Sequence, residues 1–280
     1  MPKKYLQNSL TVDTIDNVQL LLIITNVREF TGTMRLPAEK RALFDDLQRQ
    51  ITQLQGGRAM LPAAHRIGGL DLLGDAFPEK VFPGSGVHEF ISQQHGDAAA
   101  TEGFMAALAG QLMGNNGVCL WVGCARTVFP PALSAFGLCP ERIIFVDPAR
   151  EKDVLWIVEQ GLKSAALSVV VGETRNLSFT ASQRLMLAVE NSQATGLIHR
   201  CRPASENTVA CTSRWRITPV ASIPEAGMPG FGFPSWTVRL EKVRNGKPRT
   251  WQLEWIAGQF HQAATATSTI KKAVPVRKVG

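Results

Sequence analysis

Short apolar segments alternate with helical patterns through the middle of the chain. The apolar segments are four to six residues long and predict buried strands at 87–91, 117–122, 142–146, 167–171 and 196–199. Apolar residues at helical spacing predict helices between these strands at 98–113, 130–136, 151–162 and 180–190. Because such strands have no polar face, both faces of the sheet must be covered. This predicts an α/β fold with a mainly parallel sheet flanked by helices.

The pattern changes to strict alternation towards the C-terminus. Residues 208–218 place apolar side chains on one face and arginines on the other. Two further alternating segments, 235–243 and 249–256, flank a turn that contains Asn245 and Gly246. Asn-Gly between alternating segments is a strong hairpin signal. We therefore predict that antiparallel strands extend the sheet at its C-terminal end.

An amphipathic helix is predicted over 37–54, with Pro37 in its first turn and glycines after its end. Its apolar stripe consists of Leu43, Phe44, Leu47, Ile51 and Leu54. The stripe could pack on the chain's own domain, which is the commoner case, or on another protein.

The chain divides into four parts by these patterns. Residues 1–36 fit poorly with the rest and form an N-terminal extension, and Met34 is an alternative native start. Residues 37–57 hold the amphipathic helix, and residues 58–261 form the α/β domain with its hairpin. Residues 262–280 are polar, small and basic, so we expect a disordered tail.

Composition excludes several classes of protein. With 45% hydrophobic and 19% charged residues, the chain is an ordinary globular protein. A net charge of +7 gives a mild bias towards polyanions or acidic partners. Five cysteines without a C-x-x-C pair favour buried free thiols in a reducing compartment. We see neither a signal peptide nor a membrane span, because the apolar run 20–24 is far too short, so we expect a cytoplasmic protein.

The turn at 92–97 joins the first strand to its helix, which is where a nucleotide-binding α/β domain would hold a phosphate. A phosphate loop needs several glycines and a lysine. This turn has one glycine, Gly96, followed by the negative Asp97, and no lysine occurs between Lys80 and Lys152. The position suits a phosphate loop but the residues do not.

Two further parts of an ATPase site are also degenerate. The strand 167–171 is followed by Gly172, and Glu173 comes one residue later than the magnesium-binding acid should. No acid follows the strand 117–122 at 123–126. We therefore predict no catalytic residue, no metal and no cofactor. The degenerate nucleotide site comprises Gln94, His95, Gly96, Asp97, Thr101, Gly172 and Glu173. A weak DNA-stimulated ATPase that uses Glu173 stays open as an alternative.

Two other candidate chemistries are weaker. Cys124 has no histidine placed to activate it, so we expect a buried thiol rather than a nucleophile. His88 and His95 lack further residues at metal-ligand spacing.

Basic residues gather around the predicted hairpin and alternate with Trp236, Trp251 and Trp255. They are Arg239, Lys242, Arg244, Lys247 and Arg249. Cations beside aromatic rings are typical of surfaces that bind single-stranded nucleic acid or a partner. A solvated strand face backed by core tryptophans is an equally good interpretation.

Several short stretches, in order and spacing, resemble a known family. They are Ile67–Asp71, Val81–Ile91, Asp97–Thr101, Arg126–Leu133, Arg142–Asp147, Glu151–Trp156, Ser178–Ser182 and Val243–Pro248. The α/β core that they outline is similar to RecA, and it is more similar to the ImuA family, the RecA-like accessory proteins of bacterial SOS mutagenesis.

This resemblance implies a RecA-like core and a non-catalytic accessory role in SOS-induced, error-prone translesion DNA synthesis. The implied partners are an ImuB-like relative of Y-family polymerases, an error-prone C-family polymerase and RecA, with DNA as a further candidate. In RecA, basic residues in the segment matching Val243–Lys247 face a nucleotide across a subunit interface, so Lys242, Arg244 and Lys247 are the candidates here. RecA-type proteins associate through an N-terminal helix, which makes 37–54 the candidate partner contact. Since some members are related to SOS cell-division inhibitors, that role is a second alternative.

Overall fold

The computed structural model describes residues 69–77, 80–190, 192, 194–222, 231–244 and 246–263. The predicted extension 1–36, the predicted helix 37–57 and all but two residues of the predicted tail lie outside this part of the chain.

The described residues form a nine-stranded sheet in the order β3-β2-β4-β5-β1-β6-β7-β8-β9. The strands are β1 Gly86–Ser92, β2 Cys119–Val122, β3 Ile143–Val146, β4 Val169–Thr174, β5 Thr195–Cys201, β6 Ser213–Val220, β7 Ser235–Val243, β8 Arg249–Ile256 and β9 Gln259–Gln262. Pairing is parallel from β3 through to β6 and antiparallel from β6 to β9. The predicted α/β fold is therefore confirmed, including the hairpin of β7 and β8.

Three details differ from the sequence-based expectation. β6 begins at Ser213, later than predicted, and pairs parallel with β1, so only β7, β8 and β9 are antiparallel additions. β9 was not predicted, because its four residues contain a single apolar side chain, Phe260. β4 continues past Val171 to Thr174, which places Glu173 inside the strand instead of in the following turn.

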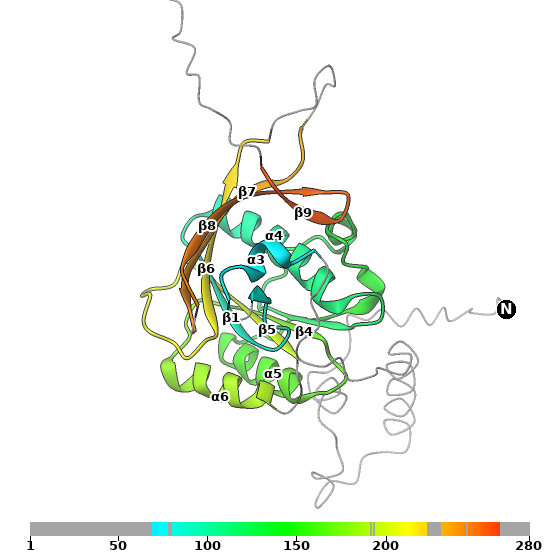
Figure 1. Ribbon diagram of the computed structural model, residues 1–280. Helices are drawn as coiled ribbons and strands as arrows, with labels where there is room; N and C mark the ends of the chain where they lie inside the picture. The colour runs from blue at the N-terminus through cyan, green and yellow to red at the C-terminus, as the bar shows by residue number, and fades with distance from the viewer. Residues whose placement is uncertain are drawn as a thin grey trace, which may run out of the picture.

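Helices cover both faces of the sheet (Figure 1). They are α3 Asp71–Gly74, α4 His95–Met113, η4 Pro130–Phe136, η5 Pro140–Arg142, α5 Glu151–Lys163 and α6 Phe179–Glu190. α4 packs on one face, and α5 and α6 pack together on the other. The C-terminal strands curl over α4, so Phe260 of β9 contacts Phe104 of α4, with ring centroids 5.2 Å apart. α4 is therefore buried on several sides, which explains why its apolar residues do not form a single stripe.

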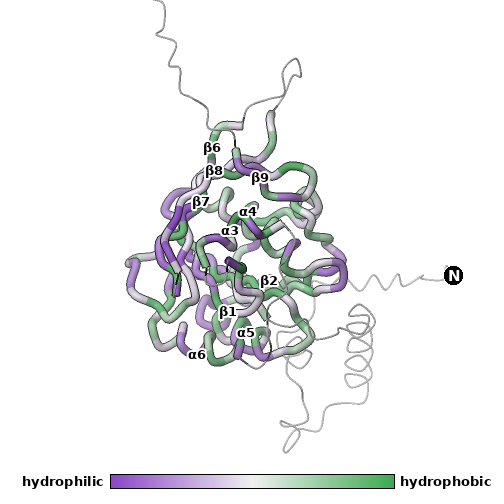
Figure 2. Tube along the Cα trace, in the orientation of Figure 1, coloured by the Kyte–Doolittle hydropathy of each residue, from purple (hydrophilic) through white to green (hydrophobic). Residues whose placement is uncertain are grey.

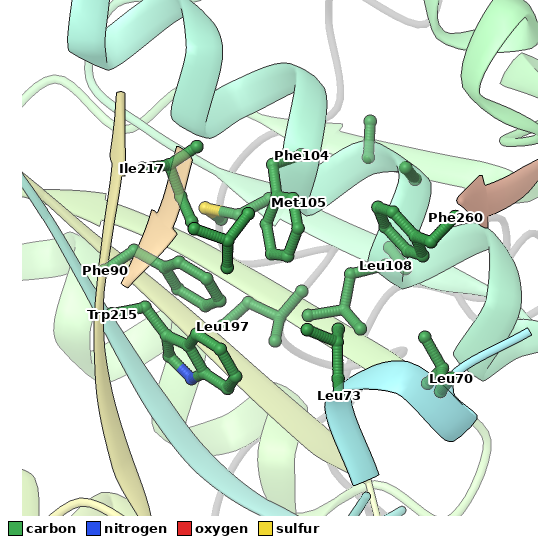
Figure 3. Packing of buried hydrophobic residues seen from close by; sticks show 14 of the residues in the cluster. Leu70, Leu73, Phe90, Phe104, Met105, Leu108, Leu197, Trp215, Ile217 and Phe260 are labelled. Carbon is green, nitrogen blue, oxygen red and sulfur yellow. The ribbon is translucent and has the colours of Figure 1, made fainter. Parts of the chain in front are cut away.

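Aromatic side chains fill the core between α4 and the sheet (Figure 3). Trp215 of β6 is fully buried and stacks on Phe90 of β1 and on Trp251 of β8, with centroid distances of 6.2 and 6.0 Å. Hydrophobic and hydrophilic positions are interspersed along the C-terminal strands (Figure 2), and Trp236, Trp251 and Trp255 of these strands are buried. The three tryptophans of the C-terminal strands are thus core residues.

A buried ion triad lies on the opposite face of β1. Glu89 is fully buried and receives hydrogen bonds from Arg200 of β5 at 2.6 Å and from Arg214 of β6 at 2.5 Å. The same two guanidinium groups also donate to carbonyl or amide oxygens of Ser205 and Asn207, in the loop between β5 and β6. One carboxylate therefore links three neighbouring strands to a long loop.

Replacing Glu89 with alanine should destabilise the protein by about 3–5 kcal/mol, because two buried guanidinium groups lose their counter-charge. Chemical denaturation monitored by tryptophan fluorescence measures this change. The matched control is Glu141→Ala, at an exposed position, which should stay within about 0.5 kcal/mol of the wild type. Equal stability of both variants would contradict a central role for the triad.

Candidate functional site

The connection between β1 and α4 is much shorter than a phosphate loop. β1 ends at Ser92 and α4 begins at His95, so only Gln93 and Gln94 join them. A phosphate loop needs a longer glycine-rich stretch whose N–H groups surround the phosphate. The predicted polar turn at 92–97 is wrong in extent, because His95, Gly96 and Asp97 already form the first turn of the helix.

The loop between β5 and β6 closes over this connection. The Arg202 N–H donates to the Ser92 carbonyl oxygen at 2.7 Å, and Arg202 adopts a left-handed backbone conformation, with a φ of 48°. The Gln93 amide donates to Glu206 at 2.7 Å, and the Arg202 guanidinium lies 3.1 Å from Nε2 of His95. The side chains of Gln93 and His95 are therefore engaged by the β5–β6 loop.

Two of the predicted nucleotide-site residues have structural roles. Thr101 is fully buried in α4, and its hydroxyl donates to the Asp97 carbonyl oxygen at 2.6 Å. A side chain on Gly172 would collide with Val158 of α5, so this position faces the layer on the far side of the sheet from α4. Neither residue points to the space at the end of β1.

Glu173 takes part in a cluster of carboxyl groups at the carboxyl ends of β2 and β4. The Trp121 indole N–H donates to Glu173 at 2.6 Å. Gly123, at the end of β2, leaves space for this carboxylate, because a Cβ there would clash with Glu173 Oε2. Burial, together with the smaller effect of the negative charges of Glu102 and Asp147, raises the pKa of Glu173 to about 7, although the hydrogen bond from Trp121 opposes this shift. Among the described residues, Glu173 forms no ion pair with a cation.

Glu102 of α4 adds to the same negative field. Burial raises the pKa of Glu102, although a hydrogen bond from Thr127 at 2.8 Å opposes that shift. Among the described residues, no group of three or more histidine, cysteine or acidic side chains has metal-binding geometry. The nearby cation Arg126 is paired with Asp147 at 2.5 Å. The edge is thus acidic, which disfavours a triphosphate.

A second polar group, Ser92, His199 and Cys201, lies at the ends of β1 and β5. The Ser92 hydroxyl lies 2.7 Å from Nε2 of His199, and the Cys201 thiol lies 3.6 Å from the same nitrogen. Burial lowers the pKa of His199 to about 4, so the imidazole is neutral at physiological pH. Because Ser92 and His199 are fully buried, they hold the strand ends together rather than meet a substrate.

The other cysteine and histidine candidates also have simple explanations. Cys124 is exposed, whereas the sequence predicted a buried thiol. Partial desolvation of the thiol and the negative charges of Glu151 and Asp153 raise its pKa. Cys139 is exposed as well. His88 is a core residue that stacks on Phe82, and burial lowers its pKa to about 3. Neither His88 nor His95 belongs to a metal-binding group of three or more side chains in the described part of the chain.

The five basic residues of the C-terminal hairpin are all exposed, whereas the tryptophans between them are buried. Arg239 pairs with Glu241 at 2.8 Å, and Arg249 lies 3.5 Å from Asp75. Within the described ranges, Lys242, Arg244 and Lys247 make no ion pair. The hairpin surface is therefore positively charged, but the buried tryptophan rings are not placed to stack on bases.

The residues that sequence reasoning missed are the buried charges. Glu89 interrupts the apolar strand Val-His-Glu-Phe-Ile, and Arg200 and Arg214 flank the loop that covers the site. A charged residue inside an otherwise apolar strand is the signal that could have indicated a buried partner.

Similarity to known proteins gives a second, independent indication of what this chain is. No protein-family profile matches the chain. Protein ImuA from two strains of Caulobacter vibrioides, NA1000 / CB15N and CB 15, is 31% identical to it over 190 residues, which cover 64% of this chain and 78% of each relative. The chain belongs to the ImuA family. The structure of SulA from Pseudomonas aeruginosa overlaps 41% of this ImuA-family chain and 97% of its own length, with 19% identity and a TM-score of 0.36, a likeness too small to bear on function.

The length and hydropathy of the helices decide whether one of them could span a membrane. None of the helices formed by the described residues of this ImuA-family chain has the length and apolar character needed to cross a bilayer.

The raised pKa of Glu173 makes stability depend on pH. The folded protein holds this proton up to about pH 7, whereas the ordinary pKa is 4.5, so the stabilisation is complete below pH 4.5 and is lost as the pH rises through 7. Replacing Glu173 with glutamine should therefore raise stability relative to the wild type by about 3 kcal/mol between pH 4.5 and pH 8. Denaturant titrations at several pH values measure this difference, with Glu190→Gln, at an exposed position, as the control. A difference in unfolding free energy that does not change with pH would contradict a raised pKa of Glu173 in the folded protein.

Proposed function

We propose that this protein is a non-catalytic, RecA-like accessory protein in SOS-induced, error-prone translesion DNA synthesis. In this role it assembles with an ImuB-like relative of Y-family polymerases and an error-prone C-family polymerase. Membership of the ImuA family supports the pathway. The observation that supports a non-catalytic role is the two-residue connection between β1 and α4, closed by the β5–β6 loop.

Electrostatics also supports the absence of ATP hydrolysis. A triphosphate with its metal needs cations and backbone N–H groups directed at it. Here Glu102 and Glu173 lie close enough for the charge of Glu102 to raise the pKa of Glu173, Asp97 lies in the first turn of α4, and no lysine belongs to the connection. Because Glu173 is a protonatable, desolvated carboxyl, it is poorly suited to hold magnesium.

Purified protein should hydrolyse ATP no faster than buffer, with or without single-stranded DNA. Addition of ATP and magnesium should leave the melting temperature unchanged, because a ligand stabilises only the state that it binds. Both measurements should be the same for Glu173→Gln. DNA-stimulated turnover that disappears in Glu173→Gln would instead establish the weak ATPase.

The predicted helix 37–54 is the proposed contact with the ImuB-like partner. The described elements already cover both faces of the sheet, with α4 and the curled β7–β9 on one side and α5 and α6 on the other. Because these faces are covered by elements other than residues 37–54, we infer that the apolar stripe predicted in the sequence of 37–54 serves to bind another protein. Helices of this kind commonly dock with their apolar face in a partner's groove.

Acidic substitutions in the stripe should abolish this contact. The double variant Leu43→Asp, Leu47→Asp should bind the ImuB-like protein of the same genome at least tenfold more weakly, because two apolar anchors become charged. Pull-down and calorimetry with purified proteins measure the loss.

The control for that experiment is Arg49→Asp, which places the same charge on the opposite side of the predicted helix. Deleting residues 37–54 should have the same effect as the double variant, and circular dichroism should show that the α/β domain stays folded. Full binding by the deletion variant would reject the helix as the contact.

A further inference from the structure

The turn between β7 and β8 concentrates positive charge. Lys242, Arg244, Lys247 and Arg249 lie within eight residues, and this stretch contains no acidic residue. All four side chains are exposed, and those of Lys242, Arg244 and Lys247 make neither an ion pair nor a hydrogen bond with any other described residue. Like charges placed so close together repel one another, and an anionic ligand would relieve this repulsion.

Carboxylates beside this turn do not neutralise it. Asp75 lies 3.5 Å from Arg249, and Glu190 lines the groove that Arg244 also borders. Glu241 is next in the sequence, but it is already shared by two arginines of β6 and β7, each at 2.8 Å. Even when Asp75 and Glu190 each offset one cation, two of the four cations of the turn remain unbalanced.

Two contacts outside the hairpin hold the backbone of the turn in place. The Arg244 N–H donates to the Thr212 carbonyl oxygen at 2.8 Å, and the Lys247 N–H donates to the Ala76 carbonyl oxygen at 3.0 Å. Gly246 packs so closely on the same segment that a Cβ would lie 2.3 Å from the Ala76 oxygen. The cations therefore project from a fixed backbone, which reduces the conformational entropy lost when they bind a ligand.

The turn lies at the opposite end of the strands from the acidic cluster around Glu173. β7 ends at Val243, which is paired with Ser213 at the start of β6, and β6 runs in the same direction as β1, β5 and β4. Glu173 lies near the carboxyl end of β4. An anionic ligand is therefore attracted to the turn and repelled from the carboxyl ends of the strands.

We propose that this turn binds the phosphate backbone of DNA through Lys242, Arg244, Lys247 and Arg249. The choice of DNA rests on the proposed function, in which the protein acts where DNA is copied. Lysine and arginine side chains commonly contact the phosphate oxygens of nucleic acids. Because the tryptophans of the hairpin are buried, the contact is made with the backbone and does not depend on the base sequence.

The composition of this surface favours DNA over an acidic protein. Protein interfaces usually have an apolar centre with charged groups at the rim. Within residues 239–244 and 246–249, no large apolar side chain is exposed. A charged surface without an apolar centre suits a phosphate backbone, because the affinity then comes largely from the release of counterions.

Fluorescence anisotropy of the full chain with a labelled thymidine oligonucleotide tests the proposal. The affinity should fall between 50 and 200 mM salt, because each phosphate contact on a single strand contributes about −0.7 to the slope of log K against log salt. The hairpin variant Arg244→Gln, Lys247→Gln should bind about tenfold more weakly at 50 mM salt, and its slope should be shallower by about 1.4.

The matched control is Lys152→Gln, Arg175→Gln. It removes one lysine and one arginine at exposed positions near the carboxyl ends of the strands, so its net charge equals that of the hairpin variant. The control should bind DNA like the wild type, and circular dichroism should be the same for all three proteins. The proposal is overturned if the wild type does not bind, if the control loses as much affinity as the hairpin variant, or if the hairpin variant binds as tightly as the wild type.

Two further ligands separate the sources of negative charge. Single-stranded and duplex oligonucleotides with equal numbers of phosphates share the same backbone chemistry, and tighter binding of either one supports the proposal and identifies the form of DNA. Labelled polyglutamate represents an acidic protein. If it binds more tightly than DNA, and this binding is lost in the hairpin variant, the turn is a protein contact and the proposal is wrong.

Binding to the ImuB-like protein gives a separate measurement on the same samples. The hairpin variant should retain that binding, because its substitutions lie outside the predicted helix 37–54. A wild-type protein that binds the ImuB-like partner but not DNA would reject this inference and leave the proposed function intact.

Discussion

The pairing of one buried carboxylate with two guanidinium groups holds the centre of the molecule together. Glu89 lies in the middle strand of the sheet and is shared between Arg200 and Arg214 on the strands at either side. A charge in that position is tolerated only because its partners are equally buried and make further hydrogen bonds. Those additional bonds reach the β5–β6 loop, so its conformation depends on the same carboxylate.

That dependence connects the centre of the sheet to the site at the carboxyl ends of its strands. The loop that the two arginines hold is the one that places Arg202 and Glu206 against the β1–α4 connection. The site therefore differs from a nucleotide site in two ways. It lacks the lysine and glycines of a phosphate loop, and the β5–β6 loop covers the β1–α4 connection. The cover contacts the connection through the Ser92 carbonyl oxygen and the side chains of Gln93 and His95.

Much of the fold could be predicted because its parallel strands are short and continuously apolar, so they stand out in the sequence. β9 could not be predicted, since a single phenylalanine among polar residues gives no periodic signal. The position of this strand depends on the contact between Phe260 and Phe104, which are far apart in the sequence. The acidic character of the site was visible in Asp97 and Glu173. Its closure was not, because Gln93 and Glu206 are separated by 113 positions.

Among the described residues, β3 is the outer strand of the parallel part of the sheet, and no described strand pairs with its outer side. Exposed strand edges can recruit strands from other chains and start aggregation. β3 has only four residues, all apolar, and the guanidinium of Arg126 lies over the ring of Phe145, 4.8 Å from its centroid. A short length and a cation at this edge limit the pairing that an Ile-Ile-Phe-Val strand would otherwise invite. A longer apolar strand in the place of β3 would therefore carry a greater risk of aggregation.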